Sequence, residues 1–188
     1  MGRPIESQFE PERVKEIREL VSRISALSLP PGSSRYYAVE LIRCLENGVL
    51  LAGLHVAASL LELSVRSFIA QRIDEFRKAS TFSENTRSVQ RALEENRSIG
   101  FAGLVDALCE AGLFERDDVQ KAKEFYRSIR IPIHHGLADR FYRSHMDELL
   151  ADLWSFGPVP SHQFEEVIED HALKHIAIVV GIMERNLV

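Results

Sequence analysis

The side chains best suited to acid-base chemistry in this 188-residue sequence lie together in residues 126–136. This stretch contains two arginines, Arg127 and Arg130, followed by a proline and two adjacent histidines, His134 and His135. Histidine has the ordinary pKa closest to neutral pH, so a neutral imidazole can remove a proton from a hydroxyl group. A guanidinium can bind a phosphate through paired hydrogen bonds. The combination predicts chemistry at a phosphate ester.

Positive charge is concentrated around this stretch, although the chain as a whole is acidic. Residues 116–145 hold seven Lys or Arg and four Asp or Glu, a local charge of +3. The formal net charge of the chain is −5, which leaves −8 for the remaining residues. A general nucleic-acid binder would have a basic surface instead. The distribution therefore favours a local phosphate site.

The motif itself resembles the hallmark of the HEPN superfamily of small helical-bundle proteins, an Arg followed four to six residues later by a His, commonly with Gly next. Four residues separate Arg130 from His135, and Gly136 follows. The similarity extends upstream to residues 99–127 and to the apolar stretch at residues 49–68. It covers about two thirds of the chain loosely and eleven residues well. Active members usually carry a polar residue, often Asn, after the Arg, where this chain has Ile131.

The resemblance implies metal-independent RNA cleavage in a cleft formed by the motifs of two protomers. It assigns binding of the phosphate to Arg130 and removal of the 2'-hydroxyl proton to His135. The product would be a 2',3'-cyclic phosphate. Arg127 is then a second phosphate contact or a solvated charge, and Tyr126 stacks on a base or belongs to the core. His134 is assigned as a neighbouring substrate contact. It also leaves the register of the motif ambiguous, although the Gly that follows His135 favours His135 as the motif histidine.

Three functional hypotheses follow for the chain. The first is a HEPN-like ribonuclease or toxin-type RNA-acting protein that works as a homodimer without cofactor, with an antitoxin as a possible partner. The second is a non-catalytic HEPN-like module that binds nucleotide, RNA or another protein, and Ile131 favours it. The third is a helical partner protein with no link to nucleic acid, which uses an exposed apolar stripe to oligomerise.

Metal chemistry has little support in the sequence. His171 and His175 are four residues apart in an expected helix, a spacing that can hold a metal only when other ligands converge. No Glu-x-x-His motif of the di-iron bundles is present. Cys44 and Cys109 form no Cys-x-x-Cys pair, which excludes a zinc finger and a disulfide scaffold. We therefore expect no metal and two buried, reduced thiols.

The fold class follows from apolar residues spaced three and four apart between a few Gly and Pro positions. The chain is 45% hydrophobic and 27% charged, which fits one globular domain over residues 1–188. We predict an all-α fold, a single antiparallel bundle of four to five main helices with short accessory helices. A first helix should start behind the capping-box pattern Ser7-x-x-Glu10. Further helices are expected at residues 33–45, 49–76, 84–95, 99–111, 117–129, 141–154 and from 161 onward.

Two local features refine this expectation. Residues 49–61 are apolar on every side of a helix, which is typical of a central helix covered by its neighbours. That run is too short to span a bilayer, and no apolar stretch follows the N-terminus. We therefore expect a cytoplasmic protein without a membrane partner. Pro132 removes a backbone donor and should break or kink the chain between Arg130 and His134.

Overall fold

The computed structural model describes residues 4–29, 32–78, 81–95, 97–131 and 161–187, and for residues 161–170 the backbone alone. All regular secondary structure in these ranges is helical, and they contain no strand. The all-α prediction is therefore confirmed for this part of the chain. The expected helix at residues 141–154 lies outside the described residues.

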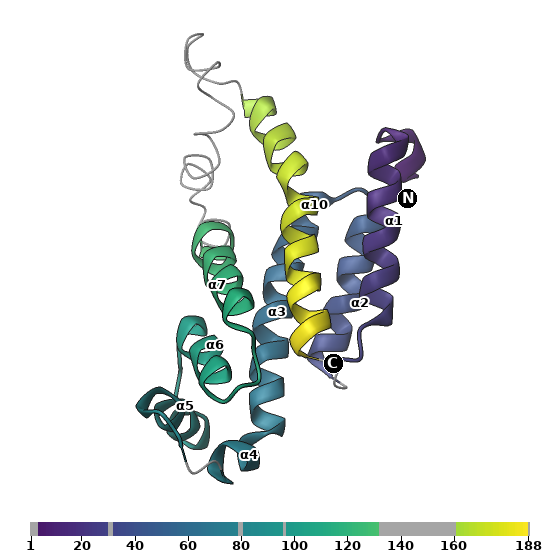
Figure 1. The fold of residues 1–188 in the computed structure, drawn as a ribbon. Coiled ribbons are helices and arrows are strands. Elements are labelled where there is room, and N and C mark those ends of the chain that lie inside the picture. Colours follow the sequence, from purple (N-terminus) through teal and green to yellow (C-terminus); the bar gives the residue numbers. More distant parts are fainter. Residues whose placement is uncertain (1–3, 30–31, 79–80, 96, 132–160, 188) are drawn as a thin grey trace.

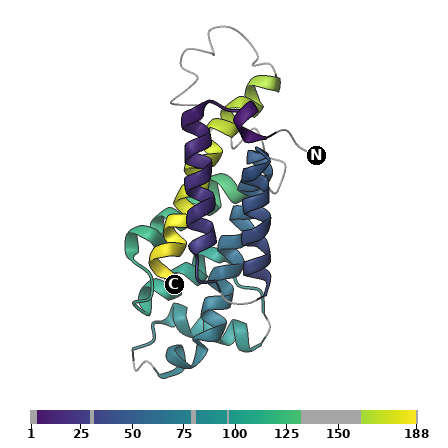
Figure 2. The same cartoon turned by 90° about the vertical axis from the view of Figure 1, so that its right-hand side faces the viewer.

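Four long helices lie side by side in the two views of the molecule (Figures 1 and 2). They are α1 (Pro11–Ala26), α2 (Ser33–Glu46), α3 (Leu50–Gln71) and α10 (Ser161–Asn186). The shorter elements are η1 (Ile5–Ser7), α4 (Ile73–Lys78), α5 (Glu84–Glu94), α6 (Phe101–Glu110), α7 (Arg116–Phe125) and the π-helical η2 (Tyr126–Arg130).

Helix α3 contributes the largest share of the core. It packs on α2 and α10 along its length and also contacts α6 and η2. Its fully buried side chains include Leu50, Leu54, Leu61 and Val65, as expected for a helix with an apolar surface on every side. By length and composition alone α3 could also cross a membrane, but half of its apolar window is buried within the protein. The core helix of a soluble bundle has the same properties.

Two glycines end helices in the conformation that the sequence predicted for turns. Gly48 follows α2 with φ +69° and Gly112 follows α6 with φ +70°, and L side chains rarely adopt such angles. Behind α6 the amide of Gly112 donates to the Cys109 carbonyl and the amide of Leu113 to the Leu108 carbonyl. The pattern is a Schellman motif, which satisfies carbonyls at the end of a helix. These two turns set the directions in which α3 and α7 begin.

One expected helix cap and one expected helix boundary are wrong. The capping box does not form, because Ser7 donates to the Pro4 carbonyl in η1 and α1 begins at Pro11 without a side-chain cap. Proline is well suited to the first position of a helix, since its missing N–H would have no partner there. The helix expected at residues 49–76 ends at Gln71, and α4 starts separately at Ile73. Acidic residues in the first turn of α4 favour a new helix N-terminus there.

Helix α10 is fastened to α7 by a buried carboxylate. Asp118 is 1% exposed and accepts two hydrogen bonds from the Arg185 guanidinium, at 2.8 and 2.6 Å. Asn186 Nδ2 donates a third at 2.7 Å, and Asn186 Oδ1 accepts from the backbone amide of Glu115 at 3.1 Å. Every polar atom in this contact has a partner, which is the condition under which burying a charge is tolerated.

The same contact predicts acid sensitivity. Hydrogen bonds from Arg185 hold the pKa of Asp118 below its ordinary value, and those from Arg23 do the same for the pKa of Glu184. A carboxylate whose pKa is lowered by folding stabilises the protein above its unfolded pKa of about 4 and loses that contribution as the pH falls further. We expect the free energy of unfolding, measured by urea titration at several pH values, to decrease below about pH 4. A flat profile between about pH 5 and pH 3 would contradict this.

Candidate functional site

The motif begins on a widened helical turn. Helix α7 continues into η2, where the amide of Ile131 donates to the carbonyl of Tyr126, five residues earlier. Such π turns are uncommon and occur frequently at functional sites. The sequence is consistent with such a turn here, because the next residue is Pro132, and a proline has no amide to donate and disfavours regular helix in the turn before it. The break predicted between Arg130 and His134 falls mostly on residues outside the described ranges, so it stays a prediction, and the described part of the chain shows only the π turn before it.

Arg130 is positioned by a carboxylate on α3. Its Nη2 donates to Glu62 Oε2 at 3.2 Å, and the other oxygen of Glu62 accepts from Arg66 Nη2 at 3.1 Å. Arg66 also donates to the backbone carbonyl of Ile99 at 2.9 Å, which ties α3 to the start of α6. One carboxylate therefore lies between two guanidiniums, and the three side chains together carry a charge of +1.

The remaining donors of Arg130 are the distinctive feature of this cluster. The side chain is 24% exposed, and its Nε is buried without a hydrogen-bond partner among the described residues. Its Nη1 makes no hydrogen bond within them either. Buried polar atoms nearly always have a partner, so an unpaired donor on a charged group needs an explanation such as an absent ligand. The guanidinium can still bind an anion in addition to Glu62.

Tyr126 lies beneath this guanidinium. Its ring stacks on the buried Phe101 with centroids 4.6 Å apart and planes at 14°, and the Arg130 carbon Cζ is 5.1 Å from the Tyr126 centroid. These contacts place Tyr126 at the margin of the core. The aromatic face orients Arg130 through a cation–π interaction. Stacking of Tyr126 on a base stays a prediction.

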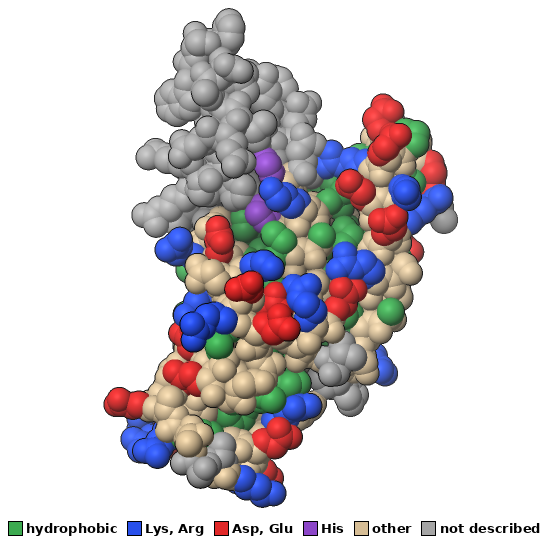
Figure 3. All heavy atoms as spheres, viewed as in Figure 1, with side chains coloured by type: hydrophobic (Ala, Val, Ile, Leu, Met, Phe, Trp, Pro, Cys, Tyr) green, Lys and Arg blue, Asp and Glu red, His purple; other side chains and the backbone are tan. Residues whose placement is uncertain are grey.

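The other predicted site residues differ in what can be said of them. Arg127 is exposed, so its charge is free to meet a phosphate or solvent. His134 and His135 lie outside the described residues, and their convergence with Arg130 stays a prediction. On the face shown in Figure 3, acidic and basic side chains are intermingled. A positive site at the motif would therefore be local.

Glu62 and Arg66 are the members of the cluster that sequence reasoning missed. A signal was present, since they form a charged pair four residues apart in a long helix that is otherwise largely apolar. Such a pair normally indicates a solvated face. Here both side chains are mostly buried, at 18% and 32% exposed. Arg130 is 68 residues further along the chain, so no local pattern could identify it as their partner.

Two histidines and two cysteines were considered in the sequence as metal ligands or thiols. The rings of His171 and His175 have centroids 6.3 Å apart, and His175 lies 6.4 Å from the Phe125 ring. Within the described ranges no three His, Cys, Asp or Glu side chains are grouped as metal ligands. Cys44 and Cys109 are free and half-buried. Burial raises the pKa of the Cys44 thiol, which lowers its reactivity.

Comparison with known proteins assigns the chain to no group. No family model matches it, no curated protein is similar to it, and no solved structure shares its fold at a significant level.

The Arg130 cluster makes a prediction about stability. In Glu62→Gln the amide cannot neutralise two guanidiniums, so we expect a loss of about 1–2 kcal/mol, between the values of surface and buried ion pairs. For a chain of this length the melting temperature should fall by about 2–8 °C, as measured by circular dichroism. The matched control is Glu16→Gln, since Glu16 is exposed on α1. Equal melting temperatures for the two variants would contradict the positioning role of Glu62.

Proposed function

We propose that the chain is a HEPN-like endoribonuclease of the toxin type, which cleaves RNA without a metal. In this proposal Arg130 binds the phosphate at the cleavage position and His135 is the general base. Arg127, His134 and Tyr126 contact the RNA on either side. The proposal rests on the resemblance in residues 126–136 and on the geometry around Arg130.

One observation carries it. Arg130 is held by Glu62 and Tyr126 at the start of the motif, yet Nε and Nη1 have no hydrogen-bond partner in the described part of the chain. A preorganised guanidinium with unused donors is suited to charge that develops on a phosphate during a reaction, because it needs no reorganisation. The neighbouring Arg127 adds a second, exposed positive charge.

The chemistry requires that a base and an anion-binding group of the protein act on the same phosphodiester. The base removes the proton of the ribose 2'-hydroxyl, and the resulting oxygen attacks the adjacent phosphorus. The phosphorus–5'-oxygen bond then breaks, which leaves a 2',3'-cyclic phosphate and a 5'-hydroxyl. Nearby Arg130 disfavours a second positive charge and so keeps His135 neutral, the form that can accept a proton.

A second candidate is a non-catalytic HEPN-like module that binds RNA, nucleotide or protein. The specific observations in its favour are Ile131, which replaces the polar residue of active members, and the ion pair that Arg130 already makes with Glu62. A carboxylate on the guanidinium reduces its attraction for phosphate. Binding without cleavage is the outcome that this candidate predicts.

The remaining parts of the proposal concern the whole chain. We place residues 1–188 in a single antiparallel bundle of four to five main helices, the architecture that the resemblance implies. The active form would be a homodimer whose two motifs face one cleft, in the cytoplasm, with an antitoxin as a possible partner. A sedimentation mass equal to one chain would contradict the composite cleft.

One experiment separates the candidates. Purified full-length protein is incubated with labelled single-stranded and hairpin RNA in EDTA, and binding is titrated at several salt concentrations. Arg130→Gln, purified in the same way, controls for contaminating nuclease. The nuclease cleaves in EDTA and Arg130→Gln does not. The module binds RNA with a salt-dependent affinity and no cleavage. If neither signal is found, the nuclease and an RNA-binding module are both wrong.

A further inference from the structure

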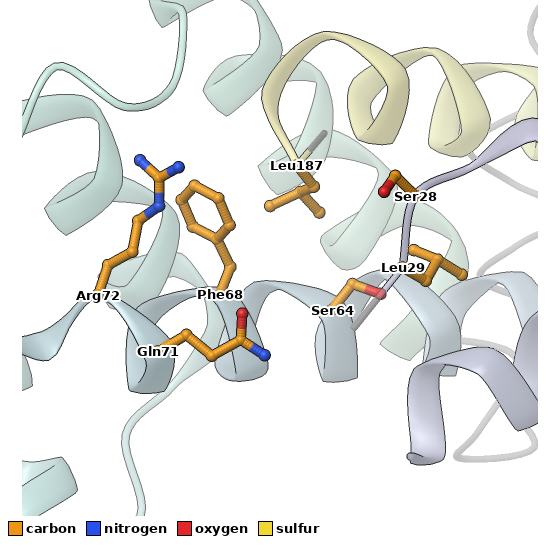
Figure 4. A pocket seen from close by; sticks show the side chains of 7 residues that line it. All are labelled: Ser28, Leu29, Ser64, Phe68, Gln71, Arg72 and Leu187. Atoms are coloured by element: carbon orange, nitrogen blue, oxygen red, sulfur yellow. The ribbon is translucent and has the colours of Figure 1, made fainter. Parts of the chain in front are cut away.

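A separate cavity of about 260 Å³ lies at the far end of α3 from its first turn. Figure 4 shows its walls: Ser64, Phe68 and Gln71 come from α3, and Arg72 follows at the end of that helix. Ser28 and Leu29 come from the segment behind α1, and Leu187 comes from the end of α10. The volume equals roughly nine water molecules in the liquid. It is therefore suited to a small organic ligand.

Ser64 is the unexplained group in this cavity. It is 1% exposed, and its Oγ has no hydrogen-bond partner among the described residues. A serine within a helix ordinarily donates to the carbonyl four residues earlier, as Ser59 does to the His55 carbonyl at 3.1 Å on the same helix. Ser64 instead directs its hydroxyl toward the wall formed by Ser28 and Leu29 (Figure 4). A buried hydroxyl without a partner is costly, and a ligand acceptor would remove that cost.

The other polar residues that line the cavity favour an anionic ligand. Ser28, Gln71 and Arg72 can all donate hydrogen bonds, and no acidic residue is among the described residues that line the cavity. The Arg72 guanidinium rests on the Phe68 ring, 4.5 Å from its centroid. Its only ion pair in the described residues is a 3.6 Å contact from Nη1 to the exposed Glu75. The remaining donors of Arg72 are therefore available to a carboxylate.

The arrangement also sets the shape of the ligand. Arg72 lies at one end in Figure 4, and Ser64 and Ser28 lie at the other, with Phe68 and Leu187 between them. Ser64 and Arg72 are eight residues apart along α3, which is about 12 Å of helix. A ligand that contacts both must carry oxygen atoms at its two ends and an apolar middle. We propose that this cavity binds a small aromatic hydroxy acid, with the carboxylate at Arg72, the ring against Phe68 and Leu187, and the hydroxyl at Ser64.

The test uses three probes in nitrogen-15 NMR titrations of the full chain, up to about 20 mM, well above the ~1 mM expected of a weak ligand. The probes are 4-hydroxybenzoate, benzoate, which lacks the hydroxyl, and 4-hydroxybenzamide, which lacks the charge. We expect 4-hydroxybenzoate to bind best. Benzoate should bind several-fold more weakly and the amide roughly tenfold more weakly, since a charge-assisted hydrogen bond is lost.

Two variants locate the contacts. Ser64→Ala should reduce 4-hydroxybenzoate affinity to that of benzoate, leave benzoate affinity unchanged, and not lower the melting temperature, because the hydroxyl has no partner to lose. Arg72→Gln should abolish the preference for the acid over the amide. The matched control is Ser34→Ala, which removes another buried unpaired hydroxyl outside the cavity and should change no affinity.

Three outcomes would overturn the proposal. The first is the absence of saturable binding of 4-hydroxybenzoate. The second is equal affinity for the acid and the amide in the unmodified chain. The third is a Ser64→Ala variant that binds 4-hydroxybenzoate and benzoate with the same ratio of affinities as the unmodified chain.

Discussion

Replacing His135 by alanine should lower the rate of RNA cleavage by about 100- to 10,000-fold, the usual contribution of a general acid or base. The reason is that the 2'-hydroxyl of ribose is a weak nucleophile until a base removes its proton. Arg130 would remain in place, so RNA binding should change far less than the rate. The measurement is single-turnover cleavage of labelled RNA in EDTA, at saturating protein.

The matched control for this variant is His134→Ala, the adjacent histidine. If His135 is the base and His134 only a contact to the RNA, His134→Ala should weaken RNA binding but retain most of the cleavage rate at saturating protein. A folded His135→Ala protein that cleaves RNA at the original rate would remove the assignment. A large loss in His134→Ala with none in His135→Ala would shift the base to His134 and leave the role of Arg130 intact.

The largest expected effect on stability comes from Asp118→Asn. The change removes the carboxylate that receives two hydrogen bonds from Arg185 and one from Asn186. Breaking a buried ion pair costs roughly 3–5 kcal/mol, but Arg185 is 46% exposed and can turn to solvent. We therefore expect a loss of about 2–3 kcal/mol. At about 2–4 °C per kcal/mol the melting temperature should fall by about 4–12 °C.

The control for Asp118→Asn is the neighbouring Asp117→Asn. Both residues lie in the first turn of α7, but Asp117 is exposed. Its substitution removes only the favourable interaction with the helix N-terminus, about 0.3–1 kcal/mol. Similar melting temperatures for the two variants would mean that the Asp118 contact does not fasten α10 to α7. Asp118→Asn should also flatten the decrease in stability below about pH 4.

Local sequence signals were enough to predict the all-α class and the approximate positions of most described helices. Apolar spacings of three and four residues and the glycines at 48 and 112 located the described helices to within a few residues. Helix α10 begins at Ser161, where the sequence analysis placed the start of the last helix. These signals work because a helix face and a left-handed turn are properties of neighbouring residues. They failed at Ser7, whose hydroxyl donates to the Pro4 carbonyl and does not cap α1.

Only the part of the candidate site that comes from one continuous stretch of sequence was predictable. Residues 126–136 pointed to the motif, and the proline pointed to a distorted helix end. The contacts of Arg130 with Glu62 and of Tyr126 with Phe101 join segments that are distant in sequence. Periodicity shows which face of a helix is buried and does not show which helix covers it. The same limit applies to Asp118, because its partner Arg185 is 67 residues further along the chain and no local pattern connects the two.

The proposed role of Arg130 rests on a balance of charge. Glu62 fixes the guanidinium and also competes with an incoming phosphate. Arg66 shares that carboxylate, so Arg130 is not fully neutralised. A nuclease needs this positive charge at the phosphate, whereas an interaction module does not.

The most direct test of the nuclease is the chemistry of the RNA ends produced in EDTA. Mass spectrometry of a defined oligonucleotide after incubation should find a 2',3'-cyclic phosphate on one fragment and a 5'-hydroxyl on the other. Both should disappear with Arg130→Gln. Intact RNA, ends of a different kind, or the same fragments from Arg130→Gln would contradict the account.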